Sequence, residues 1–154
     1  MNKLEYIPND LVMTNGNPLC TAKDVVYRVV SSDPSKTLKL ADGTTLKGAV
    51  LLENLEGAKI EDKGFLPCDS CAWVKDIVPI PLTPDFLEKN GWKFCHGFYW
   101  SPNEEGISIG LSSQTGYVWR AYTSCHISLR SDINSVSDLQ HLLFGLELNS
   151  EMEV

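Results

Sequence analysis

The residues best suited to metal or redox chemistry are five cysteines and three histidines. Cys68 and Cys71 form a C-x-x-C, a spacing that commonly contributes two of the four ligands of a structural zinc ion. Cys95-His96 and Cys125-His126 add further thiols and imidazoles. An odd number of cysteines without an export signal predicts reduced thiols, which we expect to be buried or half-buried. Because the chain has neither a second C-x-x-C nor an H-x-x-x-H, we expect no cofactor. Zinc held by Cys68 and Cys71 is the alternative.

Other patterns that could carry catalysis have simpler interpretations. Gly106 to Gly110 match G-x-S-x-G, yet apolar and small residues alternate there, which predicts a strand with an outward-facing Ser108 rather than a nucleophile elbow. Glu104 and Glu105 lie in a predicted turn, where no apolar pocket raises a carboxyl pKa for acid catalysis. We therefore assign no catalytic residue and expect a non-enzymatic protein, with an enzyme built on Cys and His as the alternative.

Two pairs of residues are candidates for binding. The alternation of a strand places Arg120 and Tyr122 on one face and Trp119 and Ala121 on the other, so an exposed Arg120–Tyr122 surface could grip a peptide or stack on bases. Lys39 and Lys47 flank a predicted hairpin turn and could line up across it. Eight of the 14 aromatic residues fall between Trp92 and Tyr122, and most of these are expected to pack in the core.

Charge limits the kinds of partner. The 154 residues carry 13 basic and 20 acidic side chains, a net charge of −7. Residues 81–154 alone have four basic and nine acidic side chains, so little counterion release would drive nucleic-acid binding there. No apolar run approaches the roughly 20 residues that cross a bilayer, and the first six residues do not resemble a signal peptide. We expect a cytoplasmic protein that binds a protein partner and neither nucleic acid nor membrane.

The first half predicts short strands. Val25–Val30 is β-branched and uninterrupted, and Thr37–Leu40 and Thr44–Lys47 flank Asp42-Gly43, which is typical of a type I′ hairpin turn. Asn54–Ser70 is polar and predicts an irregular excursion. These elements predict a small SH3-like β-barrel or strongly bent sheet over residues 1–79.

The boundary between the two halves lies at Pro79–Pro84, where three prolines in six residues exclude a helix or a central strand. Thr83 as a cap and Asn90-Gly91 as a stop predict a short helix. Five strands then follow closely as an antiparallel meander. Ser135 and Asp138 resemble a capping box for a final amphipathic helix. The fold class predicted is α+β, with a helix–meander–helix unit over residues 80–154.

The second half also resembles a known group of proteins. Ile80–Trp92 and Val136–Leu146 resemble the "PIPLTPE-LEK-GF" and "VH-LQNL-FALTG-EL" patterns of small uncharacterised proteins from gut bacteria and their phages or mobile elements. The resemblance covers residues 77–154 well, and many members look to have a small SH3-like barrel in front. It brings no known activity, so it implies no catalytic residue. The function expected is that of a binding or adaptor protein of phage or mobile-element origin.

Overall fold

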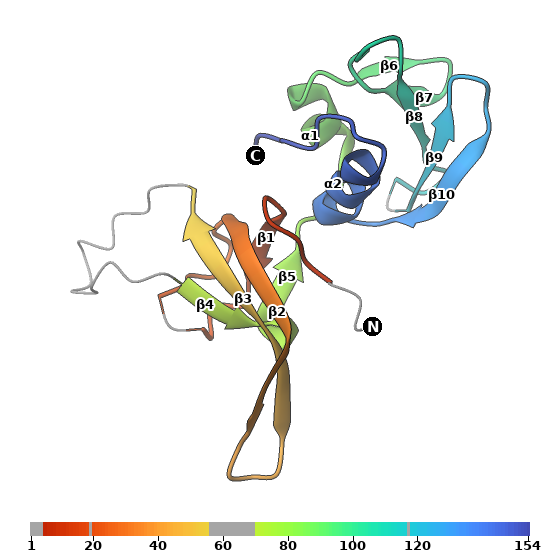
Figure 1. Cartoon of the computed structure of the whole chain (residues 1–154). Coiled ribbons are helices and arrows are strands. Elements are labelled where there is room, and N and C mark those ends of the chain that lie inside the picture. Colours follow the sequence, from red (N-terminus) through yellow and green to blue (C-terminus); the bar gives the residue numbers. More distant parts are fainter. Residues whose placement is uncertain (1–4, 19, 56–69, 117) are drawn as a thin grey trace. The chain divides into compact units, whose positions relative to one another are not determined.

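The chain folds as two compact units, Met1–Ile80 and Pro81–Val154. The computed structural model describes residues 5–18, 20–55, 70–116 and 118–154 (Figure 1). Each unit contains a five-stranded antiparallel sheet, and the two α-helices of the described residues both belong to the second unit. The fold is therefore α+β, as expected. None of the described helices has the length and apolar character needed to span a membrane.

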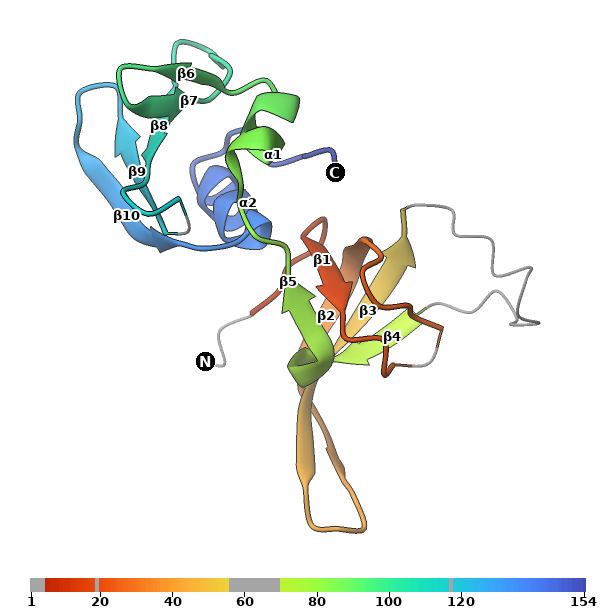
Figure 2. The same ribbon diagram turned by 180° about the vertical axis from the view of Figure 1, so that it is seen from behind.

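The first sheet has the strand order β4-β3-β2-β1-β5 (Figure 2). Its strands are β1 (Leu11–Thr14), β2 (Tyr27–Lys39), β3 (Thr45–Asn54), β4 (Ser70–Trp73) and β5 (Ile77–Pro79), with a 3₁₀ turn, η2 (Val74–Asp76), before β5. The sheet is open, so of the two predicted alternatives, a barrel or a bent sheet, the closed barrel is wrong. Its edge strands are only four and three residues long, and the ladder ends at them instead of closing.

The core of the first unit lies against one face of this sheet. Eight buried residues form it: Tyr6, Val12, Tyr27, Val29, Val50, Leu52, Ala72 and Ile77. The excursion predicted for Asn54–Ser70 falls largely on residues 56–69, outside the described residues.

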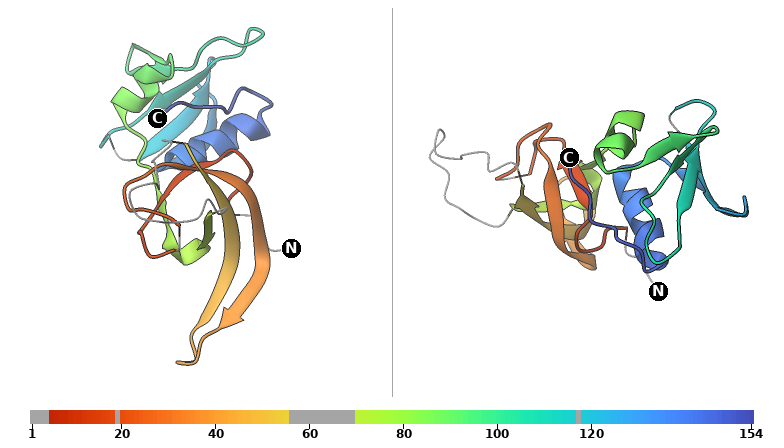
Figure 3. Two further views of the ribbon diagram at one scale, coloured as in Figure 1. Left: turned by 90° about the vertical axis from the view of Figure 1, so that its left-hand side faces the viewer. Right: turned by 90° about the horizontal axis from the view of Figure 1, so that it is seen from above.

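Strands β2 and β3 continue beyond the other strands as a two-stranded arm (Figures 1 and 3). β2 runs through Pro34 because the ladder has a bulge between Asp33 and Thr37, where a residue without an N–H is tolerated. At the tip, Gly43 has φ +88° and its N–H donates to the Leu40 carbonyl at 3.1 Å. Asp42 does not share the positive φ, so the predicted type I′ turn is wrong. The loop is one residue longer than a two-residue type I′ turn, and Gly43 occupies its left-handed position.

The second sheet has the order β10-β9-β8-β7-β6, so neighbours in the sheet are neighbours in the sequence. Its strands are β6 (Lys93–Cys95), β7 (Phe98–Trp100), β8 (Ile109–Ser112), β9 (Trp119–Thr123) and β10 (Ser128–Ile133). The sheet curls around one side of α2 (Val136–Gly145), and α1 (Pro84–Lys89) lies beside that helix (Figure 1).

Both helices begin as the sequence predicts. Thr83 Oγ1 accepts from the Phe86 N–H at 3.3 Å, Pro84 occupies the first helical turn, and Gly91 follows α1 with φ +81°. Ser135 and Asp138 form a complete capping box at α2. These caps are confirmed.

The helices bury one face of the second sheet. Leu139 and Leu143 of α2 are buried, as are Leu111 and Ala121 of β8 and β9. The indole Nε1 of Trp119 donates to the Leu82 carbonyl at 2.9 Å, which joins β9 to the segment before α1. A buried indole N–H needs such a partner, so this hydrogen bond determines how Trp119 lies in the core.

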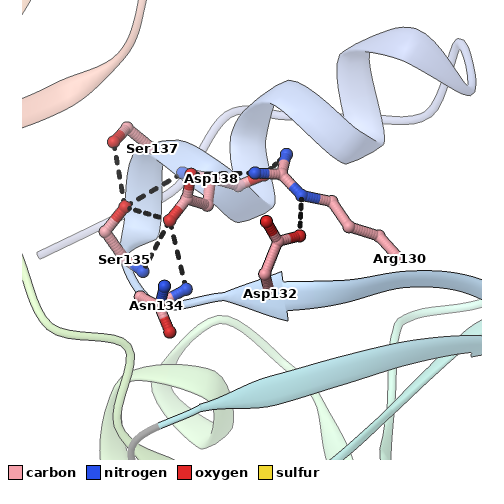
Figure 4. Close-up of polar contacts among 6 residues, drawn as sticks. All are labelled: Arg130, Asp132, Asn134, Ser135, Ser137 and Asp138. Atoms are coloured by element: carbon pink, nitrogen blue, oxygen red, sulfur yellow. Dashed lines mark hydrogen bonds and ion pairs between the residues drawn. The ribbon is translucent and has the colours of Figure 1, made fainter.

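Asp138 links the start of α2 to the sheet (Figure 4). Its Oδ2 accepts from the N–H groups of Asn134 and Ser135, both at 3.1 Å, and from the Ser135 hydroxyl at 2.9 Å. Its Oδ1 lies 3.1 Å from Arg130 Nη2, and Arg130 also pairs with the exposed Asp132. One carboxylate therefore both caps α2 and holds the guanidinium of β10.

We expect Asp138→Ala to lower the free energy of unfolding of the second unit by about 2 kcal/mol, because it removes half of the capping box and the ion pair with Arg130. Asp132→Ala is the matched control, since it removes a carboxylate from the same arginine at an exposed position and should cost no more than about 0.5 kcal/mol. Urea denaturation followed by tryptophan fluorescence measures both. Equal losses from the two variants would contradict this role of Asp138.

Candidate functional site

Four rings gather on the face of the second sheet that the helices leave uncovered. We call Phe98, Trp100, Tyr122 and His126 the aromatic cluster. The Phe98 ring lies 5.5 Å from Trp100, 5.6 Å from Tyr122 and 5.3 Å from His126, between ring centroids. The Trp100 and His126 rings are 6.4 Å apart. Phe98, Trp100 and Tyr122 are half-buried and His126 is exposed, so the cluster packs on itself and still presents ring surface to solvent.

Strand register explains why these rings share a face. Trp100 pairs with Gly110, and Gly110 pairs with Tyr122, so the three lie in one row across β7, β8 and β9. Directly paired residues point to the same side of a sheet. The adjoining row, Tyr99, Leu111 and Ala121, points to the opposite, helix-covered side, where Leu111 and Ala121 are fully buried.

Gly110 provides the space that Trp100 occupies. A Cβ at Gly110 would lie 2.9 Å from Cζ3 and 3.0 Å from Cη2 of the Trp100 indole. The φ of Gly110 is not positive, so the glycine serves close packing here rather than an unusual backbone conformation. The indole therefore lies directly over the β8 backbone.

A shallow pocket of about 200 Å³ adjoins the cluster. We call it the Arg120 pocket, and its lining residues are Ser112, Gln114, Thr115, Val118, Arg120 and Tyr122. Tyr122 belongs to both the pocket and the cluster, so the two form one continuous surface. The predicted placement of Arg120 and Tyr122 on the face opposite Trp119 and Ala121 is confirmed, because the latter two are buried. A binding role for Arg120 and Tyr122 stays a prediction.

The charge on this face is positive. Lys93 pairs with Trp100 across the β6–β7 ladder and so lies on the same face, and Arg120 lies in the pocket. Within the described ranges neither side chain forms an ion pair. Two cations are therefore available to a ligand, on a unit whose overall charge is negative.

The second candidate pair, Lys39 and Lys47, lies on the arm of the first unit. Lys39 pairs with Thr45, and Thr37 pairs with Lys47, so both lysines lie on one face but diagonally rather than directly opposite each other. Hydrogen bonds from Thr44 lower the pKa of the Asp42 carboxyl at the tip. Both lysines are exposed on the two-stranded arm, whose outer edges have no partner strand in the described sheet. Exposed lysines at such edges discourage pairing with strands of other molecules.

The thiols do not assemble into a metal site among the described residues, where no group of three His, Cys, Asp or Glu side chains is placed to hold an ion. Cys71 is an exposed free thiol of β4, and Cys68 lies outside the described residues. Cys95 and Cys125 are also exposed and free, so the expectation of buried or half-buried thiols is wrong for Cys71, Cys95 and Cys125. Cys20 is disulfide-bonded, so the expectation of reduced thiols is wrong for that residue.

The histidines next to cysteines belong to tight turns. His96 (φ +50°) and Gly97 (φ +85°) form the two-residue connection between β6 and β7, which has the positive φ angles of a type I′ turn. Cys95 Sγ lies 2.9 Å from His96 Nδ1 on the surface. His126 (φ +60°) occupies a left-handed position in the β9–β10 turn, where its N–H donates to the Thr123 carbonyl. The conformation of this turn places the His126 ring in contact with the Phe98 ring.

Ser108 of the G-x-S-x-G pattern is half-buried, directly before β8. The residues that follow it continue as a strand, so this serine does not stand at the strand-to-helix turn that a nucleophile elbow requires.

Sequence reasoning missed Phe98, Trp100 and His126 as members of a surface. The concentration of aromatic residues between Trp92 and Tyr122 was the available indication, together with the small residue at Gly110 on the neighbouring strand. Comparisons with protein-family models, with curated proteins and with solved structures find no match.

We expect Gly110→Ala to destabilise the second unit by about 1–3 kcal/mol, because the added methyl group overpacks the indole of Trp100. Gly145→Ala is the control, since a Cβ there meets nothing within 4 Å and favours the helix end. Near-ultraviolet circular dichroism should change only for Gly110→Ala. An unchanged spectrum and an unchanged urea midpoint for Gly110→Ala would contradict the contact.

Proposed function

We propose that the protein is a non-enzymatic binding or adaptor protein whose second unit recognises an extended segment of a partner protein. One observation carries the proposal: the aromatic cluster lies on the uncovered face of the second sheet and adjoins the Arg120 pocket. Half-exposed aromatic rings beside an arginine that forms no ion pair with any described residue are the residue types that dominate protein-binding surfaces.

Charge favours a protein partner over nucleic acid. Bases also stack on aromatic rings, but single-strand binding proteins surround their rings with a basic groove that follows the phosphates. Here the unit has four basic and nine acidic residues, and only Lys93 and Arg120 stand on the face of the cluster. Phosphate repulsion by the rest of the unit therefore opposes a nucleic-acid ligand.

The proposal also covers the detailed arrangement of the two units and the location of the protein in the cell. We propose an SH3-like arrangement for the open first sheet and a helix–meander–helix arrangement for the second unit, in line with the resemblance at residues 77–154. A cytoplasmic location is supported by three exposed free thiols, Cys71, Cys95 and Cys125, because reducing compartments preserve such groups. The disulfide at Cys20 counts against it.

Panning a random dodecapeptide library against the full chain tests the proposal. Synthetic copies of the enriched peptides are then titrated by fluorescence anisotropy. We expect Trp100→Ala to weaken their binding about tenfold or more, as expected for a central aromatic contact. Phe144→Ala is the matched control, because Phe144 is 65% exposed on α2, away from the cluster, and should leave binding unchanged.

Circular dichroism of both variants establishes that they are folded, and Tyr122→Ser provides a second, smaller truncation within the cluster. The proposal is wrong if no peptide is enriched, or if enriched peptides bind both cluster variants as tightly as they bind the original chain.

A further inference from the structure

The side chains that line the Arg120 pocket are suited to binding an anionic group. Its arginine lies among the hydroxyl groups of Ser112 and Tyr122 and the side-chain amide of Gln114, all of which can donate hydrogen bonds. No acidic side chain lines the pocket, and Arg120 has no ion-pair partner in the described part of the chain. A guanidinium binds a carboxylate through two parallel N–H···O bonds, which a lone surface lysine cannot do.

The pocket and the aromatic cluster lie at a defined distance from each other along β9. Arg120 and Tyr122 are two residues apart on β9, which separates them by about 6.8 Å along the strand. An extended peptide presents its own side chains i and i+2 on one side at nearly the same spacing. A peptide lying along β9 can therefore place one side chain at Arg120 and the next same-side residue against the rings.

We propose that this surface binds an acidic peptide segment in which a Glu or Asp side chain enters the Arg120 pocket and a large apolar or aromatic residue two positions away packs on the aromatic cluster. The inference rests on the proposed function and names the chemistry of its partner. Lys93, on the same face next to Trp100, provides the second positive charge for such a segment. The rest of the unit, with nine acidic residues, repels an acidic ligand. Lys93 and Arg120 therefore favour binding of such a ligand at this face by charge complementarity.

The test uses the full chain and an array of labelled decapeptides. Each peptide carries one Glu and one Trp or Leu in a Gly-Ser background, separated by one to four positions in both orders, and each has a partner in which Gln replaces Glu. Fluorescence anisotropy at about 50 and 150 mM salt gives the affinities. We expect the two-position Glu peptides to bind about tenfold more tightly than their Gln partners, and salt to reduce that difference.

Three variants locate the effect, and two of them, Arg120→Gln and Arg28→Gln, change the net charge by the same amount. Arg120→Gln should make the Glu and Gln peptides bind equally, and Arg120→Lys should restore only part of the preference, because an ammonium group cannot form the bidentate contact. Arg28→Gln changes the net charge by the same amount in the first unit, at a side chain 43% exposed, and should keep the full preference.

The outcomes separate the two proposals. Peptides that depend on Trp100 but bind equally well with Glu or Gln would overturn the acidic-peptide inference and leave the binding function standing. Absence of binding by every peptide, in the array and in the random library alike, would overturn both. Arg120-dependent binding of an oligothymidine that is tighter than any peptide would overturn the inference in favour of a nucleic-acid ligand.

Discussion

The second unit depends on covering one face of its five-stranded sheet with two helices. Leu139 and Leu143 of α2 are buried, and so are Leu111 and Ala121 of β8 and β9, which point to the same side. Alternation along each strand then forces every second residue onto the other face. In β7 and β9 those residues are Phe98, Trp100, Arg120 and Tyr122. The rings of Phe98, Trp100 and Tyr122 pack against one another, against His126 and over the backbone at Gly110, so the aromatic cluster follows from how the core is built.

Asp138 and Trp119 keep that arrangement in register. Asp138 receives hydrogen bonds from the start of α2 and pairs with Arg130 of β10, so the helix cannot shift along the sheet without breaking an ion pair and a cap together. Trp119 fixes the neighbouring strand, β9, by its hydrogen bond to the Leu82 carbonyl. Polar contacts at these two points orient the helices, while apolar burial supplies most of the stabilisation. The exposed face is thus held rigid from behind, which lowers the entropic cost of binding a ligand there.

Local features were predictable from the sequence, and features that depend on strand pairing were not. The caps at Thr83 and Ser135 rest on hydrogen bonds within four residues, so residue types alone predict them. The alternation that separates Arg120 from Ala121 is also local. In contrast, the open edge of the first sheet, the bulge at Pro34 and the packing of Trp100 on Gly110 depend on which strands meet and in which register. The type predicted for the Asp42-Gly43 turn was wrong because the loop contains one more residue than a type I′ turn. Conversely, His96-Gly97 forms a two-residue turn although it lacks the Asn or Asp that usually indicates one.

We propose that ligands bind to the uncovered face of the second sheet. Two-dimensional NMR of the nitrogen-15-labelled full chain, titrated with an acidic decapeptide carrying Glu and Trp two positions apart, tests it most directly. We expect shifts of the Trp100 indole signal, the Arg120 side-chain signal and the amides of β7 to β9. The Trp119 indole should not move, because it is buried against Leu82. Shifts confined to the arm of β2 and β3, or to Trp119 with Trp100 unchanged, would show that the ligand binds elsewhere.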